Sequence, residues 1–324
     1  MKFKVKEEAS LLNFLFSACE GMSRTSVREN LKNGRIYVNG ENKTAFDFPL
    51  NPGDVVEIVA KGVALGEKME REAAEKVGKL GLKIVYEDEH LIIVDKPSGL
   101  PAVSTGKPAD AKKDTGVFGG RERTAYTILT DYMHKQVKAE KLVTGEYSRK
   151  GRIWVVHRLD KGTSGLLMFA KDERTKDLLQ SKWAELVLER KYVAIIEGRP
   201  EHDEGTISTY LSESPKSLKM ISSDKKTPDS NKAVTHYKIV DDNGKYCKAE
   251  FQLETGRKNQ IRVHCAQVLE TPVAGDEKYG AQSNPLRRLA LHAITLVVRN
   301  PYGGGIIRLQ SGLPSEFSKV KFGK

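Results

Sequence analysis

Residues 155–167 read Val155-Val156-His157-Arg158-Leu159-Asp160-Lys161-Gly162-Thr163-Ser164-Gly165-Leu166-Leu167. Apolar residues typical of strands flank a polar turn, and its two glycines permit a tight turn or a close approach of the backbone to a ligand. A carboxylate between cationic side chains stays ionised, so Asp160 could act as a nucleophile or an electrostatic stabiliser. Taken alone, the segment favours the plainer interpretation that Asp160 is a turn residue bonded to its own backbone, with His157 and Arg158 solvated.

Two further clusters carry candidate functional side chains. One reads Thr255-Gly256-Arg257-Lys258-Asn259-Gln260-Ile261-Arg262-Val263-His264, and it opens an expected helix after an expected strand. Its arginines and helix N-terminus suit phosphate oxygens, although the same pattern is typical of an ordinary basic helix end. The other reads Glu189-Arg190-Lys191-Tyr192-Val193. There, Tyr192 at a strand start could pack in the core or stack on a base.

Hydrophobic periodicity divides the chain into three parts. Residues 1–60 predict a small module with helices beginning after Ser10 and at Ser23, a hairpin at Asn39-Gly40 and a last strand over 55–59. Residues 61–80 are rich in charge and poor in large apolar side chains, which indicates a linker, partly helical. Residues 81–324 form the third part, a large mixed domain.

Strands dominate the large domain. They are expected near 83–86, 90–94, 153–156, 166–170, 192–196, 234–240, 247–253, 294–298 and 306–309, with helices near 124–137, 173–188 and 260–269 and a mobile loop over 103–123. The connections are too irregular for repeated βαβ units. We expect an α+β fold, with a mixed, mostly antiparallel central sheet, flanking helices and a basic cleft that crosses the sheet.

Composition limits the class of protein. The 324 residues are 39% hydrophobic and 30% charged, which permits a packed core and argues against global disorder. A net charge of +11 favours a polyanionic partner. Residues 1–60 hold eight basic and eight acidic residues, so a basic surface on the module must be a local patch. No apolar run approaches the ~20 residues of a membrane-spanning helix.

Several kinds of site are not indicated. None of Cys19, Cys247 and Cys265 belongs to a Cys-x-x-Cys pair, which argues against a thiolate zinc site or a disulfide framework and favours a reducing, cytoplasmic setting. The sequence has no Gly-x-Gly-x-x-Gly opening a helix, no phosphate-binding loop of Walker spacing and no His-Glu-x-x-His. We therefore expect neither a cofactor nor a metal.

Taken together, the motifs form a recognisable series. In order they are Asp95-Lys96-Pro97-Ser98-Gly99-Leu100, the block 157–165, Lys191-Tyr192-Val193-Ala194, the block 256–264 and Arg288-Leu289-Ala290-Leu291-His292-Ala293. From about residue 82 to 313, the chain resembles the RluA-like family of pseudouridine synthases, which isomerise uridine in RNA. Residues 10–60 resemble the small RNA-binding module first seen in the fourth small-subunit ribosomal protein, through Ser23-Arg24-Thr25-Ser26-Val27 and Gly34-Arg35-Ile36-Tyr37-Val38-Asn39-Gly40.

The resemblance implies a role for each matching position. Asp160 matches the catalytic aspartate, and Tyr192 matches an active-site tyrosine stacked near the base and suspected in proton transfer. Arg262 matches the basic partner of the aspartate, with Arg257 as the alternative. Arg158 matches the arginine that fills the gap left by a flipped nucleotide.

The implied contacts with RNA extend further. In the catalytic domain, the candidate substrate-binding residues also include His157, Thr163 and Lys191, and on the module the candidates are Arg24, Arg28, Lys32 and Arg35. Two positions depart from the family pattern. Asn259 stands where the family usually has histidine, and Pro101-Ala102-Val103-Ser104 replaces a Leu-Val-His-Pro run.

The function implied by the resemblance is pseudouridine formation without a cofactor. We expect a cytoplasmic monomer that acts on structured RNA, with large-subunit ribosomal RNA as the expected target and transfer RNA as an alternative. A second hypothesis is a non-catalytic RNA-binding or ribosome-assembly factor, which would have no need of Asp160, Tyr192 and Arg262 together. A protein-interaction scaffold would leave the +11 charge without a purpose.

Overall fold

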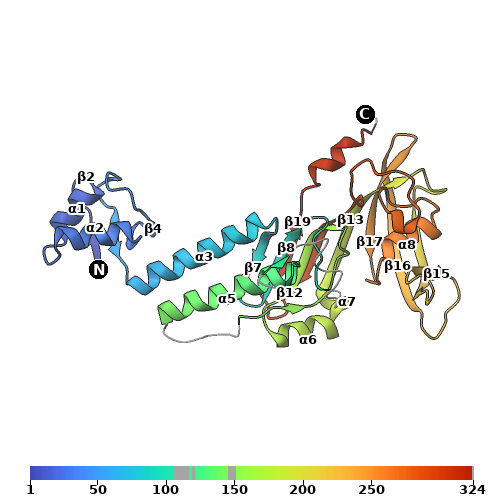
Figure 1. The fold of residues 1–324 in the computed structure, drawn as a ribbon, viewed down its shortest axis with the longest axis horizontal. Coiled ribbons are helices and arrows are strands. Elements are labelled where there is room, and N and C mark those ends of the chain that lie inside the picture. The colour runs from blue at the N-terminus through green and yellow to red at the C-terminus, as the bar shows by residue number, and fades with distance from the viewer. Residues whose placement is uncertain (105–116, 119–120, 145–150, 323–324) are drawn as a thin grey trace. The chain divides into compact units, whose positions relative to one another are not determined.

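The computed structural model describes residues 1–104, 117–118, 121–144 and 151–322 (Figure 1). The chain divides into two compact units. Unit 1 comprises Met1–Lys76 and Asp131–Gly151, and unit 2 comprises Val77–Thr130 and Arg152–Lys324. Within the described ranges, no helix has both the length and the apolar character needed to cross a lipid bilayer.

Unit 1 begins with a small α/β module. Its helices are α1 (Leu11–Ala18) and α2 (Arg24–Lys32), its sheet has the order β1 (Lys2–Lys4), β6 (Val55–Ile58), β3 (Ile36–Val38) and β4 (Glu41–Asn42), and a short pair joins β2 (Ala9–Ser10) to β5 (Pro49–Leu50). Ser23 caps α2 by accepting a hydrogen bond from Ser26 N. Ser10 occupies the same position before α1, but its side chain makes no capping hydrogen bond.

The module has its own hydrophobic core. Leu11 and Leu15 of α1 pack with Val27 of α2 and with apolar strand residues such as Ile36 and Val56, all of them buried. Asn39 and Gly40 both have positive φ, which is the backbone conformation that an Asn-Gly hairpin requires. The helices and hairpin predicted for residues 10–60 are therefore present.

The segment expected to be a partly helical linker is one continuous helix, α3 (Lys61–Lys79). In unit 1, Gly62 and Gly66 allow α3 to approach α5 (Ala125–Thr144) closely, because a Cβ at Gly62 would collide with the Leu142 carbonyl oxygen. Most of the loop expected over 103–123 lies outside the described residues. The described part of it includes a short pair of strands, β9 (Val117–Phe118) and β10 (Arg121–Glu122).

The described residues of unit 2 build an eleven-stranded sheet. Its main path is β15 (Met220–Ser223), β14 (Glu204–Glu213), β16 (Asn231–Asp242), β17 (Tyr246–Leu253), β13 (Val187–Glu197), β18 (Leu291–Arg299), β12 (Ser164–Ala170), β8 (Leu91–Lys96) and β7 (Lys83–Glu87). In addition, β11 (Trp154–Val155) pairs with β12 and β19 (Ile306–Gln310) pairs with β18. The pairing of β12 with β18 is parallel, and the other pairings in this sheet are antiparallel. The prediction of a mixed, mostly antiparallel sheet is confirmed.

Short helices accompany the sheet (Figure 1). They are α6 (Glu173–Ser181), α7 (Trp183–Leu186), α8 (Gln260–Gln267) and the 3-10 helices η1 (Glu277–Tyr279) and η2 (Ser315–Lys319). The single helix predicted over 173–188 is divided into α6 and α7 by a break at Lys182, and its last two residues belong to β13, which begins at Val187. The sequence analysis also missed β14 and β15, whose many polar residues hide the alternation of a strand.

One close backbone contact positions the turn that holds Asp160. Every residue of β12 is buried, and Gly165 pairs with Ala293 in the parallel register with β18. A Cβ at Gly165 would collide with the Ala293 carbonyl oxygen, so only glycine permits this approach. The contact brings the residues before β12 next to β18 and its neighbour β13.

Candidate active site

Asp160 lies in the polar turn between β11 and β12. Thr163 N donates to the Asp160 carbonyl oxygen at 3.1 Å, which closes the turn, and Leu159 anchors it in the core with 4% exposure. The side chain of Asp160 is 22% exposed and is directed to Arg262. The backbone of Asp160 therefore forms an ordinary turn. Its carboxylate takes no part in closing the turn and instead binds Arg262, which is distant in sequence.

Arg262 is the arginine that pairs with Asp160. Its Nη1 donates to Asp160 Oδ2 at 3.0 Å from helix α8. Arg257 instead donates from Nε to the Lys232 carbonyl oxygen at 3.0 Å. The Gln260 side chain orients the start of α8, since its Oε1 accepts from Arg257 N at 2.9 Å and its Nε2 donates to the Val234 carbonyl oxygen at 3.0 Å.

Asp276 is a member of this cluster that the sequence analysis missed. Its carboxylate accepts from Arg262 Nε at 2.6 Å and from Nη2 at 2.7 Å, and its side chain is 1% exposed. Asn259 Oδ1 accepts from Nη1 at 3.1 Å. Burial alone would lower the pKa of Arg262, but Asp276 and then Asp160 raise it, so the guanidinium stays charged. No motif considered above contained Asp276.

Tyr192 reaches the same place from β13. Its side chain is 7% exposed, and a register irregularity between β13 and β18 falls between Lys191 and Tyr192. Such irregularities re-aim side chains and are common beside active sites. Burial raises the pKa of the Tyr192 phenol, Arg190 opposes the shift and Asp160 adds to it. The phenol is therefore neutral near pH 7.

These side chains line a cavity that we name the inner cavity. It measures about 60 Å³ and is lined by Asp160, Tyr192, Arg262, Arg158, Thr163, Arg257, Asn259 and Gln260, with Leu159, Leu253, Ile261 and Leu291. This is room for roughly two waters. A larger occupant would require side chains at its mouth to move, and the exposed Arg158 is in a position to do so.

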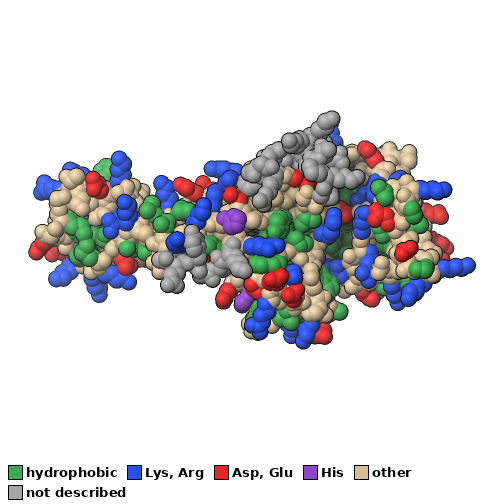
Figure 2. All heavy atoms as spheres, turned by 60° about the horizontal axis from the view of Figure 1, so that its bottom comes forward, with side chains coloured by type: hydrophobic (Ala, Val, Ile, Leu, Met, Phe, Trp, Pro, Cys, Tyr) green, Lys and Arg blue, Asp and Glu red, His purple; other side chains and the backbone are tan. Residues whose placement is uncertain are grey.

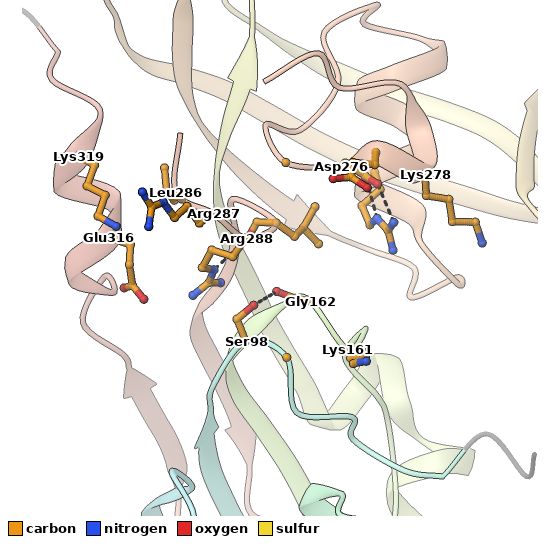
Figure 3. A pocket seen from close by; sticks show the side chains of 15 residues that line it. Ser98, Lys161, Gly162, Asp276, Lys278, Leu286, Arg287, Arg288, Glu316 and Lys319 are labelled. Carbon is orange, nitrogen blue, oxygen red and sulfur yellow. Dashed lines mark hydrogen bonds and ion pairs between the residues drawn. The ribbon is translucent and has the colours of Figure 1, made fainter. Parts of the chain in front are cut away.

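A second hollow, the outer cavity, adjoins the first. It measures about 920 Å³, and Arg262 lines both. Figure 3 shows Arg287, Arg288 and Lys319 on one side of it and Asp276 and Lys278 across from them. Ser98 and Gly162 lie between the two sides, joined by a hydrogen bond of 2.7 Å.

Two residues predicted to bind substrate do not line the inner cavity. His157 Nε2 accepts from Met168 N at 3.0 Å, and burial together with Arg190 lowers the pKa of His157 to about 3. The neutral ring therefore acts as a hydrogen-bond acceptor for the backbone of β12. Lys191 and Tyr192 are successive residues of β13, so their side chains point to opposite faces of the sheet. Lys191 forms an ion pair at 2.6 Å with Glu189, which lies on the same face as Lys191. Both side chains are thus engaged within the protein, and their contact with substrate stays a prediction.

The four module residues have different surroundings. Arg24 and Arg28 are exposed and lie over the ring of Phe16, at 5.2 and 5.4 Å from its centroid. Lys32 is exposed as well. Arg35 donates from Nε to the Val59 carbonyl oxygen at 2.9 Å and from Nη1 to Asn30 Oδ1 at 2.7 Å, so much of its guanidinium holds the module together.

Charges of both signs are spread over the visible face of the molecule. On the face shown in Figure 2, Lys and Arg side chains alternate with Asp and Glu and form no single basic field. Among the described residues, no group of three or more His, Cys, Asp and Glu side chains could hold a metal ion.

Comparison with known proteins decides the family. Residues 90–267 match the family model described as RNA pseudouridylate synthase. The chain belongs to this RNA pseudouridylate synthase family. Membership confirms the prediction of an RNA-modifying enzyme, whose reaction is an isomerisation.

The relatives cover nearly the whole chain. The uncharacterized RNA pseudouridine synthase YlyB of Bacillus subtilis strain 168 is 30% identical over 309 residues, which are 95% of this chain and 91% of the relative. Ribosomal large subunit pseudouridine synthase D of Xanthomonas campestris pv. campestris is 28% identical, with 92% and 83% covered. The solved structure of human RNA pseudouridylate synthase domain containing 4 superposes with a TM-score of 0.54 and 22% identity over 80% of this chain and 95% of that one. This last likeness supports the fold of the pseudouridine synthases.

Proposed function

We propose that this enzyme isomerises uridine to pseudouridine in structured ribosomal RNA of the large subunit, with Asp160 as its catalytic carboxylate. The observation that carries the proposal is the ion pair of Asp160 with Arg262 in a cavity that Tyr192 also lines. A carboxylate, a fixed guanidinium and an aromatic ring from three separate elements converge there.

The proposed reaction is redox-neutral. The bond between the ribose carbon C1′ and uracil N1 breaks, the same carbon joins uracil C5, and the proton leaving C5 is balanced by one gained at N1. Asp160 either attacks the ribose or removes a neighbouring ribose proton, which releases the base. Since no electron is transferred, the chemistry requires no redox cofactor.

Arg262 and Tyr192 have supporting roles in this proposal. Arg262 orients Asp160 by donating a hydrogen bond to its Oδ2. The neutral phenol of Tyr192 stacks on the uracil and assists the loss of the C5 proton. Both side chains are held by regular structure, on α8 and β13, which suits a site that must retain a free base.

The target base must leave its stack to reach Asp160. Such flipping costs a few kcal/mol, less in a loop or bulge. Arg158 is exposed at the mouth of the inner cavity and makes no ion pair or hydrogen bond with other described residues. It is therefore free to enter the gap that the flipped nucleotide leaves.

The N-terminal part contributes RNA affinity in this proposal. Residues 1–60 are an RNA-binding module, 61–80 connect it, and 81–324 carry the reaction. The exposed Arg24, Arg28 and Lys32 support this role through phosphate contacts. A relative described as a ribosomal large subunit enzyme and the resemblance of the module to a ribosomal protein support ribosomal RNA as target. The proposal includes a monomer in the cytoplasm, a location supported by three free, buried cysteines.

The Asp160→Asn variant tests the catalytic assignment. Purified wild type should form pseudouridine in ribosomal RNA taken from cells that lack this protein, and the variant should show at least ~10³-fold lower activity while still binding that RNA. Asp224→Asn, which removes an exposed carboxylate outside both cavities, is the matched control and should leave the rate unchanged. A variant as fast as wild type would favour the non-catalytic RNA-binding hypothesis.

Mapping identifies the target. Pseudouridines in total RNA from cells with and without the protein should differ at one or a few uridines of large-subunit ribosomal RNA. A difference confined to transfer RNA would replace the proposed substrate and leave the proposed reaction intact.

A further inference from the structure

Two arginines on the wall of the outer cavity differ in their counter-charges. Arg262 is bound by the carboxylates of Asp276 and Asp160. Arg288 donates to neutral acceptors: from Nε to the Leu289 carbonyl oxygen at 3.1 Å, and from Nη2 to Ser164 Oγ at 2.6 Å and the Leu291 carbonyl oxygen at 3.2 Å. Within the described ranges, Arg288 forms no ion pair. Burying a guanidinium without a counter-ion costs free energy of folding, because the charge loses hydration. An anionic ligand that binds at this place would supply the missing counter-charge.

The surroundings of Arg288 compensate its charge only in part. Burial lowers the pKa of Arg288, and the nearby Glu316 offsets only part of that shift. The positive charge of Arg288 also repels that of Lys96. The pKa of Lys96 is lowered to about 7, mainly by burial and then by Arg288. Lys96 is fully buried and donates to the carbonyl oxygens of Pro97, Leu100 and Lys161. Two cations here thus have only neutral acceptors in hydrogen-bonding contact.

Two consecutive hydrogen bonds, from Arg288 to Ser164 and between Ser164 and His292, fix the orientation of the Arg288 guanidinium, and we call this chain of three residues the Arg288 relay. Ser164 Oγ lies 2.8 Å from His292 Nδ1, and His292 is 1% exposed. Burial lowers the pKa of His292 to about 4, so its ring is neutral and forms this hydrogen bond to Ser164 through Nδ1. The hydroxyl oxygen then accepts from Arg288 Nη2. The relay leaves both N–H groups of Nη1 without a protein partner among the described residues, on a guanidinium that cannot rotate freely.

We propose that Arg288 binds a backbone phosphate next to the target uridine, and that the outer cavity holds the adjoining nucleotide. The proposal rests on the proposed function, because it takes RNA as the substrate. The N–H groups of Nη1 can donate to phosphate oxygens, and RNA carries one phosphate for each nucleotide. The exposed Arg287 and Lys319 line the same cavity, and its volume of about 920 Å³ accommodates a nucleotide. The shared wall at Arg262 connects this phosphate to the uridine at Asp160.

The salt dependence of RNA binding tests the proposal without requiring turnover. Fluorescein-labelled dodecauridylate serves as the probe, and its Kd is measured for the full chain between 50 and 300 mM KCl. For single strands, log K falls with log salt with a slope of about −0.7 per phosphate contact. Arg288→Gln should therefore make the slope shallower by ~0.7, with weaker binding at low salt.

Arg299→Gln is the matched control. It removes the same charge from an exposed position at the end of β18, outside the outer cavity, and should keep the wild-type slope. An unchanged slope for Arg288→Gln, or an equal change for Arg299→Gln, overturns the proposal. If circular dichroism shows that Arg288→Gln is unfolded, the double variant Arg287→Gln with Lys319→Gln decides instead, since both side chains are exposed on the same cavity. It should also give a shallower slope, and an unchanged slope overturns the proposal.

The outcome is separable from that of the proposed function. If the wild type forms no pseudouridine but Arg288→Gln shows a salt slope shallower by one phosphate contact, the proposed reaction is refuted and the phosphate site is supported. Pseudouridine formation together with an Arg288→Gln slope equal to wild type refutes the phosphate site alone.

Discussion

Asp276 is the residue that gives Arg262 a single orientation. Its two oxygens bind Nε and Nη2, which leaves Nη1 for Asp160 and Asn259. It also shares the charge of Arg262, so Asp160 is held in place without being fully neutralised. Asp276 acts on Asp160 through Arg262 and is therefore a positioning residue.

Replacing Asp276 with asparagine should affect both stability and catalysis. Breaking a buried ion pair costs about 3–5 kcal/mol of unfolding free energy. Because Arg262 loses its fixed orientation, kcat on RNA should fall at least ~10-fold, with a smaller change in KM. Rates are normalised to the folded fraction measured by circular dichroism, and Asp224→Asn is again the control. If kcat per folded molecule stays at the wild-type value, Asp276 is purely structural.

At the scale of elements, β12 and β18 determine where the Asp160 turn lies. The parallel pairing of Ser164 with His292 and of Gly165 with Ala293 joins the turn to the strands that carry Tyr192 and the Arg288 relay. The approach depends on Gly165, which has a φ of 108° and no room for a side chain. The glycine of this motif is therefore required by packing between strands and not by ligand binding.

Gly165→Ala should therefore destabilise unit 2 severely. The new methyl group collides with Ala293 backbone, and we expect a loss above ~4 kcal/mol of unfolding free energy, measured by chemical denaturation. Gly244→Ala is the matched control, because Gly244 also has positive φ but would place its Cβ in open space. It should cost only ~1 kcal/mol. Similar losses for the two variants would contradict the role given to the contact between strands.

At the scale of the whole molecule, three neutral histidines connect stability to pH. Burial lowers the pKa of His264 and His292 to about 4, and burial with Arg190 lowers that of His157 to about 3. An unfolded histidine has a pKa of about 6.5. Between these values the unfolded chain binds more protons, so stability is fully present above pH ~6.5 and is lost as the pH falls.

The free energy of unfolding should therefore decrease from pH 7 to pH 5. Each histidine contributes up to about 1.4 kcal/mol per pH unit below pH ~6.5. Denaturant unfolding at pH 7, 6 and 5 and constant ionic strength measures the slope. His292→Gln should reduce the slope of unfolding free energy against pH by up to about 1.4 kcal/mol per pH unit, the contribution of one histidine. His202→Gln, at an exposed position, is the control and should leave the slope unchanged. Equal stability at pH 7 and pH 5 would argue against neutral buried histidines.

The sequence by itself determined the family and most of the elements that carry the site. The block around Asp160, the strand start at Tyr192 and the helix opening before Arg262 were recognisable because each is a local pattern of residue types. Most strands of the large domain and the module hairpin also followed from periodicity and turn residues, whereas β14 and β15 did not.

Only the tertiary structure decided which of these side chains meet. Arg262 and Asp160 are 102 residues apart, and no local pattern distinguishes Arg262 from Arg257 as the partner. The places of Asp276, of the Ser164–His292 relay and of His157 likewise depend on strand register and helix packing. Contacts of this kind result from burial of the whole sheet, whose free energy is shared among distant residues and leaves little trace in any short segment.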